Sequence, residues 1–264
     1  MELLANGQKH IPLIYGGMGM GSHIYFESKV LRLSNKSGAQ TDQQRPFYIL
    51  INGSPTPDRT KFIEDGQEDP TPVLISLANT YRNGCDFMMV ICNTAHHFYD
   101  RTTSNIKFPW INLIDITSER IAKTLGKGLR VGVLGTNGTV KTRLFDTSLE
   151  RFGLKPVGFK HGTKQQEQLH EAIYDREYGI KSTGDTISGK AAEIVNRSVH
   201  SLKHLGIDAV IPGCTELSMA LNNLKLNIPV IDPLEVAAEV MIEIAYGDRS
   251  VLAHYANLHA AARN

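Results

Sequence analysis

The sequence predicts an α/β fold with two similar lobes, each built on a mainly parallel four-stranded sheet flanked by helices. Short apolar runs that end in glycine or polar residues recur along the 264-residue chain. They alternate with longer segments of helical periodicity, which is typical of βα units around a parallel sheet. In addition, the two halves repeat one another at a nearly constant offset. These observations together predict two related lobes with a site between them.

Strands are expected where an apolar run meets a glycine or polar loop, and helices where apolar residues recur with helical spacing. The expected strands are 12–15, 47–51, 87–91, 131–134, 209–212 and 229–231. Helices are expected over 118–125, 189–205 and 238–264. Ligands of such sheets bind beyond the carboxyl ends of the strands, and the polar motifs lie there.

The internal repeat relates two cysteines. Gly84, Asp86 and Cys92 recur 122 positions later as Gly206, Asp208 and Cys214, and Pro109, Ile111 and Asn112 recur 120 positions later as Pro229, Ile231 and Asp232. Chance similarity of βα units is the alternative, but agreeing offsets favour duplication. The predicted lobes are 1–118 plus 238–264, and 119–237. If they face each other about a pseudo-twofold axis, the two thiols face one cleft.

Composition narrows the class of partner. The 28 basic and 27 acidic residues give a net charge of +1 without a block of like charge, which argues against nucleic acid and anionic membranes and favours a small molecule. No signal segment and no run of about 18 apolar residues is found. Three cysteines are too few for a disulfide framework, so a reducing, cytoplasmic location is expected.

Two thiols on opposite sides of one carbon can invert a stereocentre. Amides at a helix N-terminus favour the thiolate, whose ordinary pKa of about 8.5 then falls toward neutrality. Such a thiolate in one lobe can remove a proton, and a protonated thiol in the other can return one to the opposite face. This chemistry needs no metal, no redox cofactor and no covalent intermediate, so no cofactor is expected.

Other uses of the cysteines are weaker. Zinc prefers closely spaced ligands, whereas Cys85 and Cys92 are seven apart on one expected strand. A nucleophile formed by Cys92 with His96 or His97 leaves the second cysteine without a role. Cys85 itself is interpreted as a small buried hydrophobe.

Six motifs in order along almost the whole chain resemble the pyridoxal-phosphate-independent aspartate/glutamate racemases of the wider aspartate/glutamate/hydantoin racemase superfamily. CNTAH and GCTEL together are specific, whereas GGMG or LGT alone is weak. The chain departs from the usual pattern at Met20 and Ile91, where proline is common, and neither change removes a reacting group. The motifs are GGMG (16–19), PDRT (57–60), CNTAH (92–96), LGTNGT (134–139), IYDREYGIK (173–181) and GCTEL (213–217).

The resemblance implies a two-base racemase of an acidic amino acid, in which Cys92 and Cys214 stand on opposite faces of the substrate Cα. It also implies a homodimer. Basic side chains suit a substrate with two carboxylates, because an arginine fork pairs one of them bidentately. The implied substrate-binding positions are Arg59, Asn93, Thr94, Thr136, Lys181 and Thr215.

Plainer roles stay open for several of these side chains. Asn93, Thr94 and Thr215 are also good helix caps, and His96 is better explained as a structural histidine. Glu216 is either a first-turn residue whose charge is favoured by the helix dipole, or a residue that orients Cys214. Other superfamily reactions are alternatives: maleate isomerisation also uses paired cysteines, hydantoin racemisation keeps the fold, and arylmalonate decarboxylation uses one cysteine only. A non-catalytic protein that binds an acidic amino acid is the alternative from another class.

Overall fold

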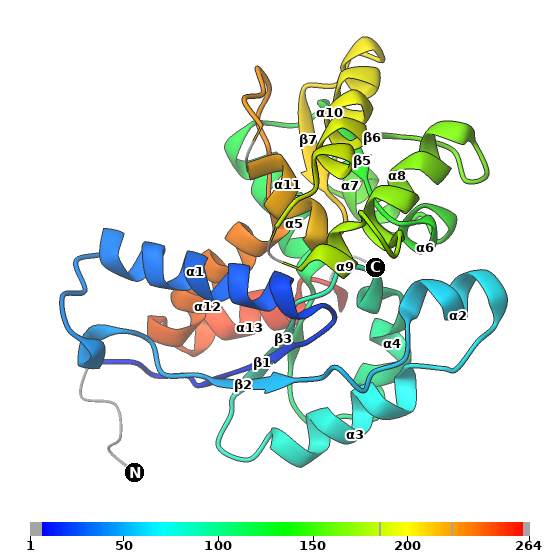
Figure 1. Cartoon of the computed structure of the whole chain (residues 1–264). Coiled ribbons are helices and arrows are strands. Elements are labelled where there is room, and N and C mark those ends of the chain that lie inside the picture. Colours follow the sequence, from blue (N-terminus) through cyan, green and yellow to red (C-terminus); the bar gives the residue numbers. More distant parts are fainter. Residues whose placement is uncertain (1–6, 185, 223, 261–264) are drawn as a thin grey trace.

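The computed structural model describes residues 7–184, 186–222 and 224–260, which form two α/β lobes around two parallel sheets (Figure 1). The first sheet has the strand order β2-β1-β3-β4, and the second has the order β6-β5-β7. The strands are β1 (Pro12–Gly16), β2 (Ile49–Asn52), β3 (Phe87–Val90), β4 (Trp110–Ile111), β5 (Arg130–Leu134), β6 (Lys155–Gly158) and β7 (Ala209–Pro212).

Helices connect and cover these strands. Two short 3-10 helices, η1 (Asp42–Gln44) and η2 (Thr94–Phe98), complete the connections of the first lobe. The α-helices are α1 (Met20–Lys36), α2 (Arg59–Asp65), α3 (Thr71–Tyr81), α4 (Tyr99–Thr103), α5 (Leu113–Thr124), α6 (Asn137–Lys141), α7 (Asp146–Arg151), α8 (Lys164–Tyr174), α9 (Ile180–Thr183), α10 (Gly189–His204), α11 (Thr215–Asn222), α12 (Pro233–Tyr246) and α13 (Arg249–Asn257).

The predicted fold class is confirmed, and the two sheets share one topology. In each sheet the first strand in sequence lies between the second and the third, so β3 and β7 occupy equivalent places. The fourth strand differs: β4 pairs with β3 over two residues, whereas residues 229–231, expected as a strand, form only one parallel bridge between Val230 and Val210. Edge strand β6 was not predicted, because Pro156 interrupts a short run with little apolar character.

The duplicated Asn112 and Asp232 have the same structural task in the two halves. The Asn112 side chain accepts hydrogen bonds from the backbone amides of Ile114 and Asp115 and so caps α5. The Asp232 side chain accepts from the amide of Leu234 and caps α12, which has proline at its first position. A side-chain acceptor at this position satisfies amides that the helix itself leaves unpaired, which explains why both crossovers start a helix here.

Each sheet is covered on both faces. In the first lobe, α1, α12 and α13 bury one face with Ile14, Met89 and Met241, and α3 and α4 cover the other. In the second lobe, α8, α10 and α11 cover one face and α7 covers the other. Helix α5 contributes to a core in each lobe, so the predicted boundary at 118 falls inside a shared helix, and that at 238 falls inside α12.

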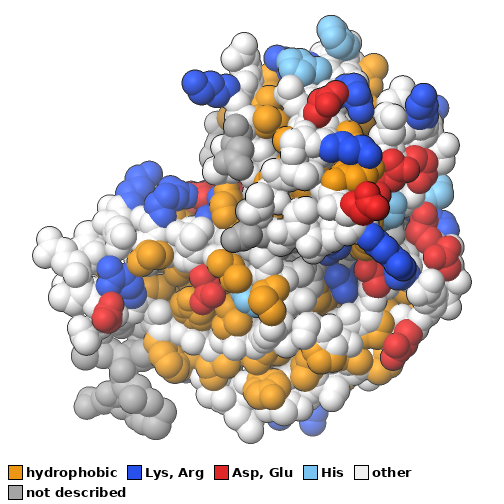
Figure 2. Space-filling view, in the orientation of Figure 1, with side chains coloured by type: hydrophobic (Ala, Val, Ile, Leu, Met, Phe, Trp, Pro, Cys, Tyr) orange, Lys and Arg blue, Asp and Glu red, His pale blue; other side chains and the backbone are white. Residues whose placement is uncertain are grey.

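The C-terminal segment expected as one helix forms two, α12 and α13, separated at Gly247 and Asp248; residues 261–264 lie outside the described part. Asp248 caps α13 through the amides of Ser250 and Val251, which starts a new helix there. Basic and acidic side chains are interspersed on the face shown in Figure 2, in keeping with the near-zero net charge. Within the described residues, no helix is long and apolar enough to cross a membrane.

Candidate active site

All eight residues that the sequence predicted for the site line one small cleft between the lobes. The cleft has a free volume of about 10 Å³, roughly the room needed by one water molecule. The structure thus brings the predicted residues together, while their chemical roles stay predictions. The lining side chains are Met18, Arg59, Cys92, Asn93, Thr94, Thr136, Tyr174, Lys181, Cys214, Thr215 and Glu216.

The two thiols enter the cleft from equivalent positions. Cys92 lies two residues after β3, and Cys214 lies two residues after β7. Both are buried, with 6% and 5% of their surface exposed. A direct link between their loops is the Asn93 side-chain amide, which donates to the carbonyl of Pro212 over 3.2 Å. The loops that carry the two thiols are therefore in contact.

A carboxylate and an ammonium group stand beside Cys214. Its Sγ donates to Glu216 Oε2 over 2.9 Å, and Lys181 Nζ lies 2.5 Å from Glu216 Oε1. Burial and then the charge of Glu216 raise the pKa of Cys214 well above its ordinary value. Burial opposes the charges of Glu216 and Lys181, but their mutual attraction outweighs it, lowering the pKa of the acid and raising that of the base. The pair is therefore ionised.

Arg59 supplies a second cation on the side of Cys92. Its guanidinium donates to the carbonyls of Met18, Thr56 and Pro57 over 3.0 to 3.2 Å, which fixes it against the glycine loop. Burial disfavours its charge, but interactions led by Cys92 outweigh burial and raise its pKa further. Its Nε is buried and has no hydrogen-bond partner within the described structure, so one donor is left for a ligand.

Asn93 and His96 have different tasks. Asn93 Oδ1 is buried without a partner among the described atoms, which suits an acceptor for a ligand N–H group. The His96 ring instead contacts backbone at both nitrogens: Nδ1 lies 2.9 Å from the Cys92 carbonyl oxygen, and Nε2 accepts from the Leu113 amide over 3.0 Å. Burial lowers the pKa of His96 to about 4. These contacts support a structural histidine and leave it no proton-transfer contact with the thiol.

Threonine hydroxyls join the lobes at the floor of the cleft. Thr136 caps α6 through the amide of Thr139, and its hydroxyl lies 3.1 Å from that of Thr60 in the first lobe. The Thr94 hydroxyl lies 3.1 Å from that of Thr139. Thr215 donates to Glu216 Oε2 over 3.2 Å. Capping and a place in the cleft lining thus coincide at Thr136.

Comparisons with known proteins show which family the chain matches. The family model of the Asp/Glu/hydantoin racemases matches residues 16–241, which include both thiols and every other predicted site residue. The chain belongs to this family. The likeness read from the six sequence motifs is therefore confirmed.

Individual relatives of this racemase-family chain agree with the match. The broad specificity amino-acid racemase of Bacillus subtilis is 27% identical over 220 residues, covering 83% of this chain and 91% of that protein. The solved aspartate racemase of Picrophilus torridus is 27% identical, covers 90% of this chain and 94% of its own, and has a TM-score of 0.76. An aspartate racemase homologue of Pyrococcus horikoshii, 24% identical, shares the fold with a TM-score of 0.68 over 90% of this chain and 100% of its own.

Three lining residues were not among the predicted site residues: Glu216, for which the sequence left two roles open, Tyr174 and Met18. Tyr174 belongs to the IYDREYGIK motif, and its hydroxyl donates to Asp58 Oδ2 over 3.1 Å, from the second lobe to the first. Its place in that motif was the only sequence signal for it. Met18 belongs to the GGMG loop, where Gly17 takes φ 85° and approaches Asn52 so closely that a side chain has no room.

Helix α2 connects the lobes across the cleft. Besides the contacts of Asp58 and Thr60 at its start, Glu64 near its end lies 3.0 Å from His161 and 3.5 Å from Lys141, both in the second lobe. A substrate is far larger than the free volume of the cleft, so the lobes must part before it enters. Parting them breaks the contacts of α2 with the second lobe, whereas the hydrogen bonds of Arg59, its first residue, lie within the first lobe.

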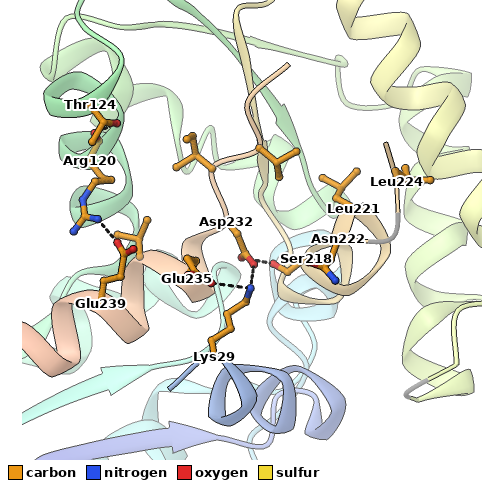
Figure 3. Close-up of a pocket in the computed structure, with 13 residues that line it drawn as sticks. Lys29, Arg120, Thr124, Ser218, Leu221, Asn222, Leu224, Asp232, Glu235 and Glu239 are labelled. Atoms are coloured by element: carbon orange, nitrogen blue, oxygen red, sulfur yellow. Dashed lines mark hydrogen bonds and ion pairs between the residues drawn. The ribbon is translucent and has the colours of Figure 1, made fainter. Parts of the chain in front are cut away.

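A larger cavity of about 500 Å³ lies elsewhere, among α1, α5, α11 and α12 (Figure 3). Its charged groups are paired with one another: Lys29 lies 2.9 Å from Asp232 and 3.1 Å from Glu235, and Arg120 pairs with Glu239. The cavity has no cysteine in its lining. Size alone favours this cavity, but Cys92 and Cys214, two buried polar atoms without a described partner (Arg59 Nε and Asn93 Oδ1) and residues of all six family motifs lie in the smaller cleft.

Proposed function

We propose that the chain racemises an amino acid without a cofactor, using Cys92 and Cys214 as the two bases. The main support is that the two thiols, from equivalent strands of the two lobes, line the same buried cleft. A thiolate on one side takes the α-proton, and the thiol on the other side gives its proton to the opposite face. The product is the other enantiomer, and each cysteine ends in the protonation state that the other had before.

Aspartate and glutamate are the proposed substrates. Lys181 and Glu216 neutralise each other, so Arg59 is left as the cation for a side-chain carboxylate. Asn93 Oδ1 offers an acceptor to the substrate ammonium group. The aspartate racemase of Picrophilus torridus supports this choice, whereas the broad specificity racemase of Bacillus subtilis makes neutral and basic amino acids necessary comparisons.

Exchange of the α-proton in deuterated water, followed by NMR, tests the function. The protein is offered each enantiomer of aspartate and glutamate, with alanine and lysine as neutral and basic comparisons. We expect exchange of an acidic amino acid together with formation of its other enantiomer, without an added cofactor. Exchange of alanine or lysine alone would contradict an acidic substrate, and exchange of none would favour a binding protein or another superfamily reaction.

Cysteine variants test the mechanism. Cys92→Ala and Cys214→Ala are each expected to abolish racemisation, because one face of the Cα then lacks its proton carrier. Cys85→Ala is the matched control, since Cys85 packs in the first lobe outside the cleft. Racemisation by either folded site variant at the rate of the wild type would show that the two-base mechanism is wrong.

A further inference from the structure

Different charges face the two thiols. Cys214 donates a hydrogen bond to the carboxylate of Glu216, a group that attracts the thiol proton and repels a thiolate. On the Cys92 side the cleft is lined instead by the guanidinium of Arg59, a cation. The two halves of the site are therefore chemically unequal, although the sheets that carry the thiols have the same topology.

Glu216 is held where this asymmetry requires it. Lys181 contacts Oε1 at 2.5 Å, and Oε2 accepts from Cys214 and from Thr215. Gly19 lies against the same carboxylate, because a Cβ there would be 3.2 Å from Oε1. Fixed from several sides and only 3% exposed, Glu216 cannot turn away from the thiol without leaving Lys181 unpaired.

We propose that Glu216 is a positioning residue that keeps Cys214 as a thiol in the empty enzyme, so that Cys214 is the resting proton donor and Cys92 the resting base. This assignment deepens the proposed racemase function and rests on it. In one turnover, the Cα–H proton passes to the Cys92 thiolate while the Cys214 proton passes to the other face of Cα. A Cys214 thiolate is then left beside Glu216, and Lys181 on the far side of that carboxylate limits the repulsion.

Other titratable groups near Cys214 favour or disfavour its thiolate according to the sign of their charge. Lys181 favours a Cys214 thiolate, whereas a negative charge on Cys92 or Tyr174 disfavours one. Glu216 is the group in direct hydrogen-bond contact with the sulfur. Its removal and that of Lys181 must therefore move the titration of Cys214 in opposite directions.

Alkylation measured separately for each cysteine tests this assignment without requiring turnover. The full chain is treated with iodoacetamide between pH 6 and 10, and each thiol is followed by mass spectrometry of its peptide. We expect the rate of Cys214 to reach half of its maximum above the ordinary thiol pKa of about 8.5. Glu216→Gln should lower the midpoint of Cys214 by about one unit or more, and Lys181→Gln should raise it.

Control variants separate positioning from general damage. Glu193→Gln makes the same charge change on α10, where its side chain is 75% exposed and pairs with Arg197. It should leave every midpoint unchanged. Lobe opening changes the rates of both site thiols but not their midpoints, and Cys85 reports on unfolding. If Glu216→Gln does not fold, the wild-type midpoint of Cys214 and its shift in Lys181→Gln still decide.

Three outcomes would overturn the assignment: a Cys214 midpoint at or below the ordinary thiol pKa of about 8.5, an unchanged Cys214 midpoint in folded Glu216→Gln, or shifts of the same sign in both variants. The expected midpoints without racemisation of any amino acid would instead contradict the proposed function and leave the asymmetry of the thiols established.

Discussion

Tyr174→Phe should make the cleft open more often. The variant removes a hydroxyl that donates to Asp58 across the lobes and keeps the ring beside Lys181. Asp58 can be hydrated once the lobes part, so the lost contact lowers the free energy of opening by about 1 kcal/mol. Since 1.4 kcal/mol is a factor of ten, the open population should rise about fivefold.

Iodoacetamide reports this change because both site thiols are almost fully buried. When opening and closing are faster than alkylation, the rate follows the open population. We expect the alkylation rates of Cys92 and Cys214 to rise by the same factor, about five, and the rate of Cys85 to stay unchanged.

Tyr178→Phe is the matched control for this variant. Its hydroxyl donates to Glu171 in the same lobe, so its loss should not affect opening. Unchanged rates of both site thiols in Tyr174→Phe, or an equal rise at Cys85, would refute the role given to Tyr174. A rise at Cys214 alone would indicate a local effect on that thiol.

Three further variants test the surroundings of the site. His96 has a pKa of about 4 in the folded protein, where it is neutral, but takes up a proton near pH 6.5 in the unfolded chain. The free energy of unfolding should therefore fall by about 3 kcal/mol from pH 7 to pH 4. His96→Gln should remove that part of the pH dependence, as measured by urea titrations. Asp115→Asn should destabilise the fold by about 3 kcal/mol in the same assay, because Arg151 loses its buried partner. Ser148→Ala removes only a hydroxyl that donates to Asp115, so it should cost less, and equal losses would contradict this reasoning. Gly19→Ala should lower the racemisation rate on the order of tenfold, because the added methyl group displaces Glu216. Gly189→Ala is the control, since a methyl group there contacts no other atom of the described chain, and equal rates of the two variants would show that Gly19 has no such effect.

Several features could be predicted from sequence because they depend on local pattern. The apolar runs before Cys92 and Cys214 end in polar loops, and the near-constant offset relates them as equivalent strands. A parallel sheet then places both thiols at carboxyl ends of strands. The same repeat marked Asn112 and Asp232, which the structure shows to be the caps of α5 and α12.

Other features depend on contacts between distant segments and left no local signal. The sequence left two roles open for Glu216, and only the positions of Cys214 and Lys181 show that its carboxylate contacts both. Tyr174 and Asp58 are 116 positions apart, so no periodicity could pair them. Residues 229–231 have a strand-like composition, but only Val230 bridges to the sheet, because tertiary packing rather than propensity decides pairing at an edge.

The arrangement of the cleft links closure to chemistry. Each lobe carries one thiol of the cleft, so in the proposed mechanism proton removal and proton return are both possible only when the lobes are together. Arg59 lies on the first lobe and Thr215 on the second, so a substrate that contacts both in the proposed mechanism adds an attraction present only on closure. Part of the binding free energy is thus used to assemble the acid and the base around Cα and to exclude water. An open form with the same residues has no proton carrier on the second face.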